Sequence, residues 1–153
     1  MSKLARGMLA GAIGTAAMSA VMVVKAAMGV MPDLNAIHMM AKMASGMTGM
    51  AVPAAGGWVM HFLIGTVVWG GLFGLIHDRL PGSTVARGVG LAVGAWLLMM
   101  VAVMPMAGAG LFGLKLGIMA PMATLMLHLI YGVVLGASFA ALGSRSVPAT
   151  RGA

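Results

Sequence analysis

The sequence predicts an all-α, polytopic membrane protein with four transmembrane helices, arranged as two duplicated hairpins, and one amphipathic surface helix. The first observation is composition: 61% of the 153 residues are hydrophobic and only 7% are charged, a balance that soluble domains do not show. The second is that the apolar residues fall into four segments of bilayer length. The third is that these segments resemble one another in pairs. We expect a single transmembrane domain over residues 1–153.

The charged residues are few and mostly basic. Nine lysines and arginines oppose only Asp33 and Asp78, which gives a formal net charge of +7. The basic residues are scattered singly, without the runs or aromatic-interleaved patches that bind nucleic acid. They are expected at helix ends, against the anionic lipid of the bilayer. The absence of cysteine excludes disulfides, thiolate metal sites and thiol nucleophiles.

The four predicted spans cover about residues 7–30, 57–76, 88–106 and 117–142, each near the ~20 residues that a bilayer core of ~30 Å requires. A cleaved signal peptide is the alternative for the first span, but this apolar run exceeds the roughly 7–15 residues of a signal peptide's hydrophobic region. Four crossings place six basic residues on one side: Lys3, Arg6, Arg79, Arg87, Arg145 and Arg151. The positive-inside rule then predicts that both termini are cytoplasmic, with residues 144–153 as a tail.

The segment of about residues 33–50 predicts a surface helix. Its apolar arc on a helical wheel holds Ile37, Met39, Met40, Met43, Ala44, Met47 and Met50. The opposite arc holds Asn35, His38, Lys42, Ser45 and Thr48. Pro32 and Asp33 supply a stop for the first span and an N-cap for this helix. An amphipathic helix on the outer membrane surface fits this pattern.

The second and fourth spans can be aligned with each other. Residues 61–79 match residues 128–145 with one gap at Thr66, which gives 18 pairs, seven of them identical. The identical pairs are His61/His128, Gly65/Gly132, Val67/Val133, Val68/Val134, Gly70/Gly136, Phe73/Phe139 and Arg79/Arg145. The tripeptide ARG likewise opens the first span at 5–7 and the third at 86–88. Duplication of one hairpin, as in parallel-repeat membrane folds, explains both matches.

Small residues at four-residue spacing predict close helix packing, since helices in lipid associate where their backbones can approach. The glycines concerned are Gly7, Gly11, Gly70, Gly74, Gly90, Gly94, Gly132 and Gly136. On an ideal helical wheel Gly70 and Gly74 lie roughly opposite His61 and Gly65. The second span would then have two faces that permit close approach. We expect one face to serve the bundle and the other to serve a homo-oligomer or a larger membrane complex.

His61 and His128 are candidate cofactor ligands. The duplication predicts that the two imidazoles lie at the same depth on different helices, as axial ligation of a b-type haem would require. Gly65 and Gly132, one turn further along the same faces, would leave room for a flat macrocycle. The alternative is a pair of ordinary interface histidines, copied by duplication, that bind a carbonyl group or a lipid headgroup.

The nineteen methionines suggest a second kind of site. Met39, Met43 and Met47, and again Met100 and Met104, have the spacing that places thioethers on one helix face. Together with His38 they could bind Cu(I), because soft thioether and imidazole ligands select this ion. The alternative is that methionine serves as an adaptable apolar residue in packing.

The predicted function is that of a non-catalytic structural or accessory membrane protein. No acidic residue lies inside a predicted span, so a carboxylate relay for protons or Na⁺ lacks its parts, and no hydroxyl nucleophile has a base beside it. An enzyme is therefore not expected. Copper handling, binding of haem or another cofactor, and carriage of a small solute are the alternatives.

The segment GMLAGAIGTAAMSAVM at residues 7–22 resembles the first helix of small, uncharacterised bacterial inner-membrane proteins similar to the acid-resistance protein YagU. The resemblance extends to the plan of four spans. It implies a bacterial inner (plasma) membrane location and provides no site residue.

Overall fold

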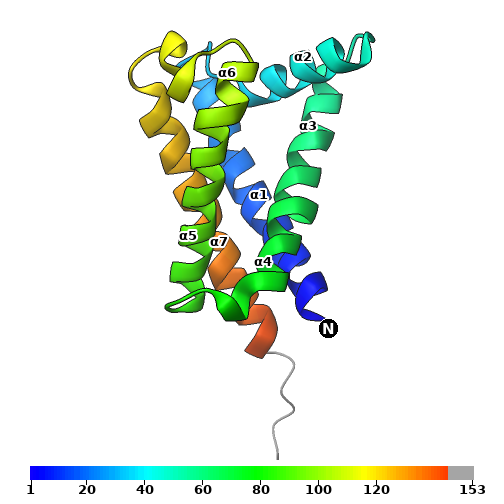
Figure 1. The fold of residues 1–153 in the computed structure, drawn as a ribbon, viewed down its shortest axis with the longest axis vertical. Helices are drawn as coiled ribbons and strands as arrows, with labels where there is room; N and C mark the ends of the chain where they lie inside the picture. The colour runs from blue at the N-terminus through cyan, green and yellow to red at the C-terminus, as the bar shows by residue number, and fades with distance from the viewer. Residues whose placement is uncertain (145–153) are drawn as a thin grey trace, which may run out of the picture.

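The structure, a computed structural model, describes residues 1–144. Within this range it is all-helical, and four helices are long and apolar enough to cross a membrane, which confirms the predicted fold class (Figure 1). The first span is α1 (Lys3–Ala27) and the fourth is α7 (Ala120–Ser144). Of the predicted tail only Ser144 is described, and it ends α7; Arg145 and Arg151 lie outside the described residues.

The second and third spans each contain a π-helical segment. The second consists of α3 (Ala54–Leu63), the π-helix η1 (Ile64–Gly70), α4 (Gly71–Ile76) and the short 3-10 helix η2 (His77–Arg79). The third consists of α5 (Thr84–Leu98), the π-helix η3 (Met99–Val103) and α6 (Met104–Met106). A further 3-10 helix, η4 (Leu111–Leu116), connects it to α7. A π-helical turn holds one more residue than an α-helical turn, and such turns are frequent at functional sites.

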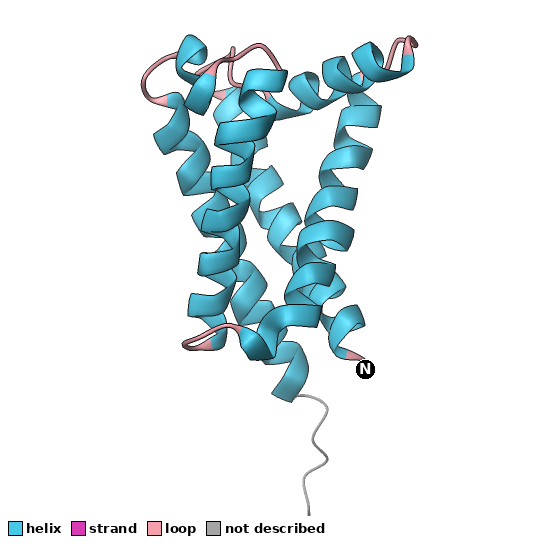
Figure 2. Cartoon of the chain, in the orientation of Figure 1, coloured by secondary structure: helices cyan, strands magenta, loops and turns pink. Residues whose placement is uncertain are grey.

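The surface helix α2 (Ala36–Thr48) is shorter than predicted and begins later. Its N-cap is Asn35, whose Oδ1 accepts from the backbone N–H of His38 at 3.1 Å, so Pro32 and Asp33 belong to the preceding turn. Gly49 ends the helix with φ +70°, a left-handed conformation that glycine adopts readily. α2 lies across the end of the bundle opposite the N-terminus (Figure 2), and we call this end the α2 end.

The spans pack in the order second span, α1, α7 and α5. α1 contacts η1 and α4 of the second span on one side and α7 on another, and α7 also packs along α5. Phe73 of α4 and Phe139 of α7 fill the centre near the N-terminal end, with ring centroids 5.1 Å apart in an edge-to-face arrangement. α1 and α3 move apart toward the α2 end (Figure 1).

Glycines form the contact between α1 and the second span. A Cβ at Gly7 would meet the carbonyl oxygen of Gly70 and, at 2.7 Å, the Cα of Gly74. A Cβ at Gly11 would lie 2.6 Å from the Gly65 carbonyl oxygen and 2.8 Å from the Gly70 Cα. Gly65 and Gly70 therefore lie on the same face. The prediction of two opposite faces assumed a regular α-helix and is wrong, because the π-helical turn between these glycines takes up an additional residue.

The contact between α5 and α7 uses a different α5 glycine from those predicted. A Cβ at Gly88 would meet the Gly132 carbonyl oxygen and, at 2.9 Å, the Gly136 backbone nitrogen. A Cβ at Gly132 would lie 2.7 Å from the Ala92 Cβ. A Cβ at Gly90 or Gly94 would meet nothing within 4 Å. Gly90 and Gly94 therefore take no part in packing within the described chain.

Candidate ligand-binding cavity

A cavity of about 800 Å³ occupies the half of the bundle nearer α2. Residues from all four spans and from α2 line it. Val68 of η1 and Leu98 of α5 line the cavity and are also 52% and 55% exposed. Because these two exposed side chains belong to spans that stand apart (Figure 1), we place the mouth of the cavity between the second span and α5, on the surface that faces lipid.

Methionine and histidine side chains gather in this cavity. Nine of the nineteen methionines line it: Met18, Met22, Met39, Met40, Met43, Met47, Met60, Met99 and Met104. Three of the four histidines, His38, His61 and His128, also line it. Neither Asp33 nor Asp78, the two acidic residues of the chain, belongs to its lining. The walls thus combine an apolar, adaptable surface with three imidazole rings and the Lys25 side chain.

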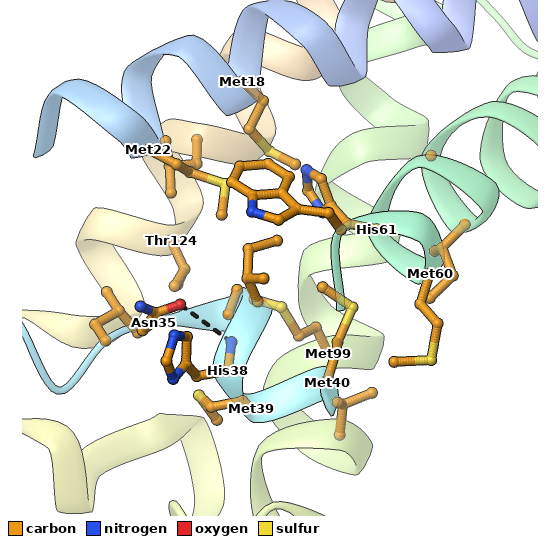
Figure 3. Close-up of a pocket in the computed structure, with 18 of the residues that line it drawn as sticks. Met18, Met22, Asn35, His38, Met39, Met40, Met60, His61, Met99 and Thr124 are labelled. Atoms are coloured by element: carbon orange, nitrogen blue, oxygen red, sulfur yellow. Dashed lines mark hydrogen bonds between the residues drawn. The ribbon is translucent and has the colours of Figure 1, made fainter. Parts of the chain in front are cut away.

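His61 projects from α3 and is only 7% exposed. Its Nε2 lies 3.2 Å from the Oγ of Ser19 on α1, and the Trp58 ring meets it edge-on at 5.9 Å between centroids. Ser19 stands between Met18 and Met22 on α1, and both of these line the cavity. Figure 3 shows Met18, Met22 and His61 around the same space.

His128 projects from α7 and is held by its own helix. Its Nδ1 lies 2.8 Å from the backbone carbonyl oxygen of Thr124, one turn earlier. A carbonyl oxygen can only accept, so Nδ1 carries the proton and the neutral ring presents a lone pair at Nε2. No hydrogen bond engages this Nε2 within residues 1–144.

Tyr131, which the sequence did not single out, joins α7 to the π-helix. Its hydroxyl donates to the Gly65 carbonyl oxygen at 2.7 Å, and the side chain is 4% exposed. This hydrogen bond holds α7 against η1 at the wall of the cavity, since both residues line the cavity. The lining methionines Met18 and Met22 were also missed, although they have the same four-residue spacing that drew attention to Met39 and Met43.

The structure brings together some of the predicted cofactor residues and separates others. His61, His128 and Gly65 line one cavity. Gly132 does not, because it faces Gly88 and Ala92 in the α5 contact. Gly132 therefore leaves no room for a macrocycle, and the space beside the histidines arises where α3 separates from α1 (Figure 1).

The predicted copper residues are also divided. Met39, Met43, Met47, Met104 and His38 all line the cavity. Met100 does not line the cavity but is fully buried in a cluster with Leu34, Met104, Ala109 and Ala120. The Met100 sulfur lies 3.9 Å from the Thr124 Oγ1, so Met100 has a packing role in this structure.

Comparisons with known proteins identify a family but no described relative. The profile of a family of unknown function, DUF6789, matches residues 1–150. No curated protein matches the chain, and no solved structure matches it. The resemblance of the first helix to proteins similar to YagU stays a prediction.

Proposed function

The chain belongs to the DUF6789 family of unknown function, and for this integral membrane protein we propose the non-catalytic binding of a mainly apolar small molecule inside the membrane. The observation that carries the proposal is the cavity of about 800 Å³ that takes lining residues from every span. Small-molecule sites typically measure about 300–1,000 Å³ and combine apolar walls with a few polar groups. A methionine-rich wall suits such a ligand, because thioether side chains adapt to irregular shapes.

The polar groups of the cavity indicate how the ligand would be anchored. Tyr131 and Thr124 donate to carbonyl oxygens of the chain at 2.7 and 2.8 Å, and Lys25 donates to the Val30, Met31 and Leu34 carbonyl oxygens. The His128 Nε2 lone pair has no partner within residues 1–144. It would accept a hydrogen bond from a ligand hydroxyl or N–H group, or bind the metal of a tetrapyrrole such as haem b. Carriage of a small solute would use the same anchor.

Filling the mouth of the cavity tests this proposal. In Leu98→Trp the larger side chain occupies the mouth, so the amount of small molecule that co-purifies with the protein in nanodiscs is expected to fall at least fivefold. Leu97→Trp is the matched control, because Leu97 is 45% exposed on the same helix and does not line the cavity. Mass spectrometry of the organic extract measures the ligand, and an absorption band near that of haem b identifies a haem.

Equal ligand content in the two tryptophan variants would contradict the proposal. So would the complete absence of any co-purifying molecule beyond bulk lipid from the wild-type protein, provided that it is extracted from its own membrane.

A second proposal, self-association, rests on Gly90 and Gly94. These two glycines lie one turn apart on α5, and nothing in residues 1–144 covers them. Small residues at this spacing let membrane helices approach closely, so a second copy of α5 or a subunit of a larger membrane complex could pack there. Gly70 and Gly74, which formed one of the two faces that the sequence offered for this role, are covered by α1.

Substitution of Gly90 tests self-association directly. Gly90→Leu is expected to weaken the dimer in detergent at least tenfold, because a branched side chain separates the backbones. Gly46→Leu is the control, since Gly46 is likewise open, with nothing within 4 Å of an added Cβ, but lies on α2. Analytical ultracentrifugation measures the dissociation constant, and an unchanged constant for Gly90→Leu would refute this interface.

We also infer that the two hairpins arose by duplication and that the termini are cytoplasmic in a bacterial inner membrane. The gap at Thr66 in the alignment of the second and fourth spans falls inside the π-helix η1, where an inserted residue would be accommodated. Gly7 and Gly88, the last residues of the two ARG tripeptides, lie against Gly70 and Gly136 respectively, which are an aligned pair. Lys3, Arg6, Arg79 and Arg87 stand at the ends of spans opposite α2, which supports the orientation.

A further inference from the structure

We infer that the cavity binds a lipid with an anionic head and an apolar chain, and that Lys25 holds the head at the α2 end. The inference rests on the proposed function and names the class of ligand. Among residues 1–144, Lys25 is the only lysine or arginine that lines the cavity, and neither acidic residue of the chain lines it. An apolar space with a single positive charge at its rim favours an anionic ligand over a cationic one.

Lys25 lies in the last turn of α1, where a lysine side chain usually extends to the headgroups and water. Here the ammonium group is held by the turn between α1 and α2. The Lys25 Nζ donates to the carbonyl oxygens of Val30, Met31 and Leu34 at 3.2, 3.0 and 2.8 Å. Val30 and Leu34 also line the cavity. The three hydrogen bonds therefore fix a positive charge at the rim of the cavity.

No carboxylate of the described chain neutralises this charge. Within residues 1–144 the ion pairs join Asp78 to Lys3 and to His77, and Asp33 does not line the cavity. The carbonyl groups satisfy the three N–H groups of Lys25 but leave its net charge in place. Because an unpaired charge is costly near an apolar interior, an anion beside the ammonium group would stabilise it.

Asn35 provides a further donor next to the ammonium group, because it follows Leu34, whose carbonyl oxygen accepts from the Lys25 Nζ. The Asn35 Oδ1 accepts from the His38 backbone N–H at 3.1 Å, whereas its Nδ2 has no partner within residues 1–144. Asn35 and His38 line the cavity, and Figure 3 shows them side by side. An oxygen of the anionic head would accept from Nδ2. A second oxygen would replace the Val30 carbonyl, the most distant of the three acceptors, at Nζ.

The layout of the cavity matches the way a lipid lies in one leaflet of a bilayer. Lys25, Asn35 and His38 lie at the α2 end, where the headgroups of that leaflet would be. Val68 and Leu98, at the mouth, are apolar and lie further along their spans, toward the middle of the membrane. A lipid chain would enter sideways through this mouth while its head stays at the interface, and the methionine side chains would adapt to the chain.

Photo-crosslinking of the full-length protein tests this inference. The protein would be stripped of co-purified small molecules, placed in phosphatidylcholine nanodiscs and irradiated with a fatty acid that carries a diazirine in mid-chain, under mildly alkaline conditions that ionise the carboxyl group. Peptide mass spectrometry is expected to find the label on residues that line the cavity. A fatty alcohol with the same chain and diazirine is expected to label them at least tenfold less, because it offers Lys25 no negative charge.

Substitutions of Lys25 test its part in holding the head. Lys25→Gln is expected to reduce labelling by the acid at least tenfold, whereas Lys25→Arg keeps the charge and should retain most of the labelling. Lys42→Gln is the matched control, because Lys42 lies on α2 and does not line the cavity. It removes the same charge at the same end of the bundle, so it corrects for the general attraction of an anionic lipid to a basic protein.

Competition identifies the source of the anionic head, which a free fatty acid and an acidic phospholipid both provide. Unlabelled oleate and phosphatidylglycerol would each be added in excess to the wild-type protein with the labelled acid. At least one of them is expected to reduce labelling of the cavity at least fivefold, and the one that does so is the class of lipid that the site takes.

Three results would overturn the inference. They are equal labelling of the wild-type cavity by the acid and the alcohol, an equal loss in Lys25→Gln and Lys42→Gln, and competition by neither anionic lipid. The comparison of acid with alcohol uses the wild-type protein, so it decides the question even if Lys25→Gln does not fold. Equal labelling would leave a cavity that binds apolar molecules without selecting anions, so the proposed function would stand, and the Leu98→Trp comparison tests that function separately.

Discussion

Replacing Gly88 with alanine is expected to destabilise the protein by about 3 kcal/mol, because overpacking a close contact costs roughly 1–3 kcal/mol and occasionally more. The added Cβ would meet the Gly132 carbonyl oxygen and, at 2.9 Å, the Gly136 nitrogen. Both atoms belong to the backbone of α7, so relief requires one helix to move. Gly90→Ala, two residues away on α5, is expected to stabilise the protein by about 0.5–1 kcal/mol, since alanine restricts the unfolded chain more than glycine does.

The two variants can be compared by steric trapping or by unfolding in mixed micelles, with each free energy of unfolding measured against the wild-type protein. Gly90 provides the control because a Cβ there would meet nothing within 4 Å. A Gly88→Ala variant as stable as Gly90→Ala would show that α5 and α7 are not held together at this contact.

Deleting Thr66 is expected to leave the protein folded, whereas deleting Val133 is expected to abolish folding. Thr66 lies in the π-helix η1, and removing one residue from a π-helical turn converts it to an α-helical turn while the flanking residues keep their faces. His61 would still face Ser19, and Gly70 would still face Gly11. Val133 lies in a regular stretch of α7, where removing one residue rotates everything beyond it by about 100°.

That rotation would take Gly136 off α5 and Phe139 out of the core, where it is 1% exposed. Monodisperse elution in detergent and protection of the core from protease distinguish the two deletions. Aggregation of the Thr66 deletion to the same extent as the Val133 deletion would contradict the proposed duplication, in which the fourth span corresponds to this helix without the additional residue.

The fold was predictable because a bilayer imposes simple requirements on a chain. A run of about 20 apolar residues predicts a span, and the structure has four such spans. The four-residue spacing of glycines and the polar arc on α2 can likewise be recognised from residues that are close together in the sequence. The span limits were less accurate. α1 begins at Lys3 because the Ser2 side chain caps the helix: its Oγ accepts from the Ala5 N–H at 3.2 Å. The hydropathy of a segment does not show where such a cap starts the helix.

The candidate site was only partly predictable. His61 and His128 were selected from the alignment, and both line the cavity. Met18 and Met22 were passed over because a helical wheel shows which residues share a face but not which helix that face meets. Gly132 was predicted to line the cofactor site only because it follows His128 by four residues. In the structure it lies against Ala92 of α5 instead.

The sequence by itself determined that this chain is a membrane protein with four apolar helices, because hydropathy and helical periodicity act over a few turns. Tertiary structure decided which glycines meet, and the π-helix η1 is the physical reason: one additional residue places Gly65 and Gly70 on the same face toward α1. It also decided where α3 separates from α1, and so which methionines and histidines share a cavity. Such proximity depends on how whole helices cross, which the order of residues within one helix does not specify.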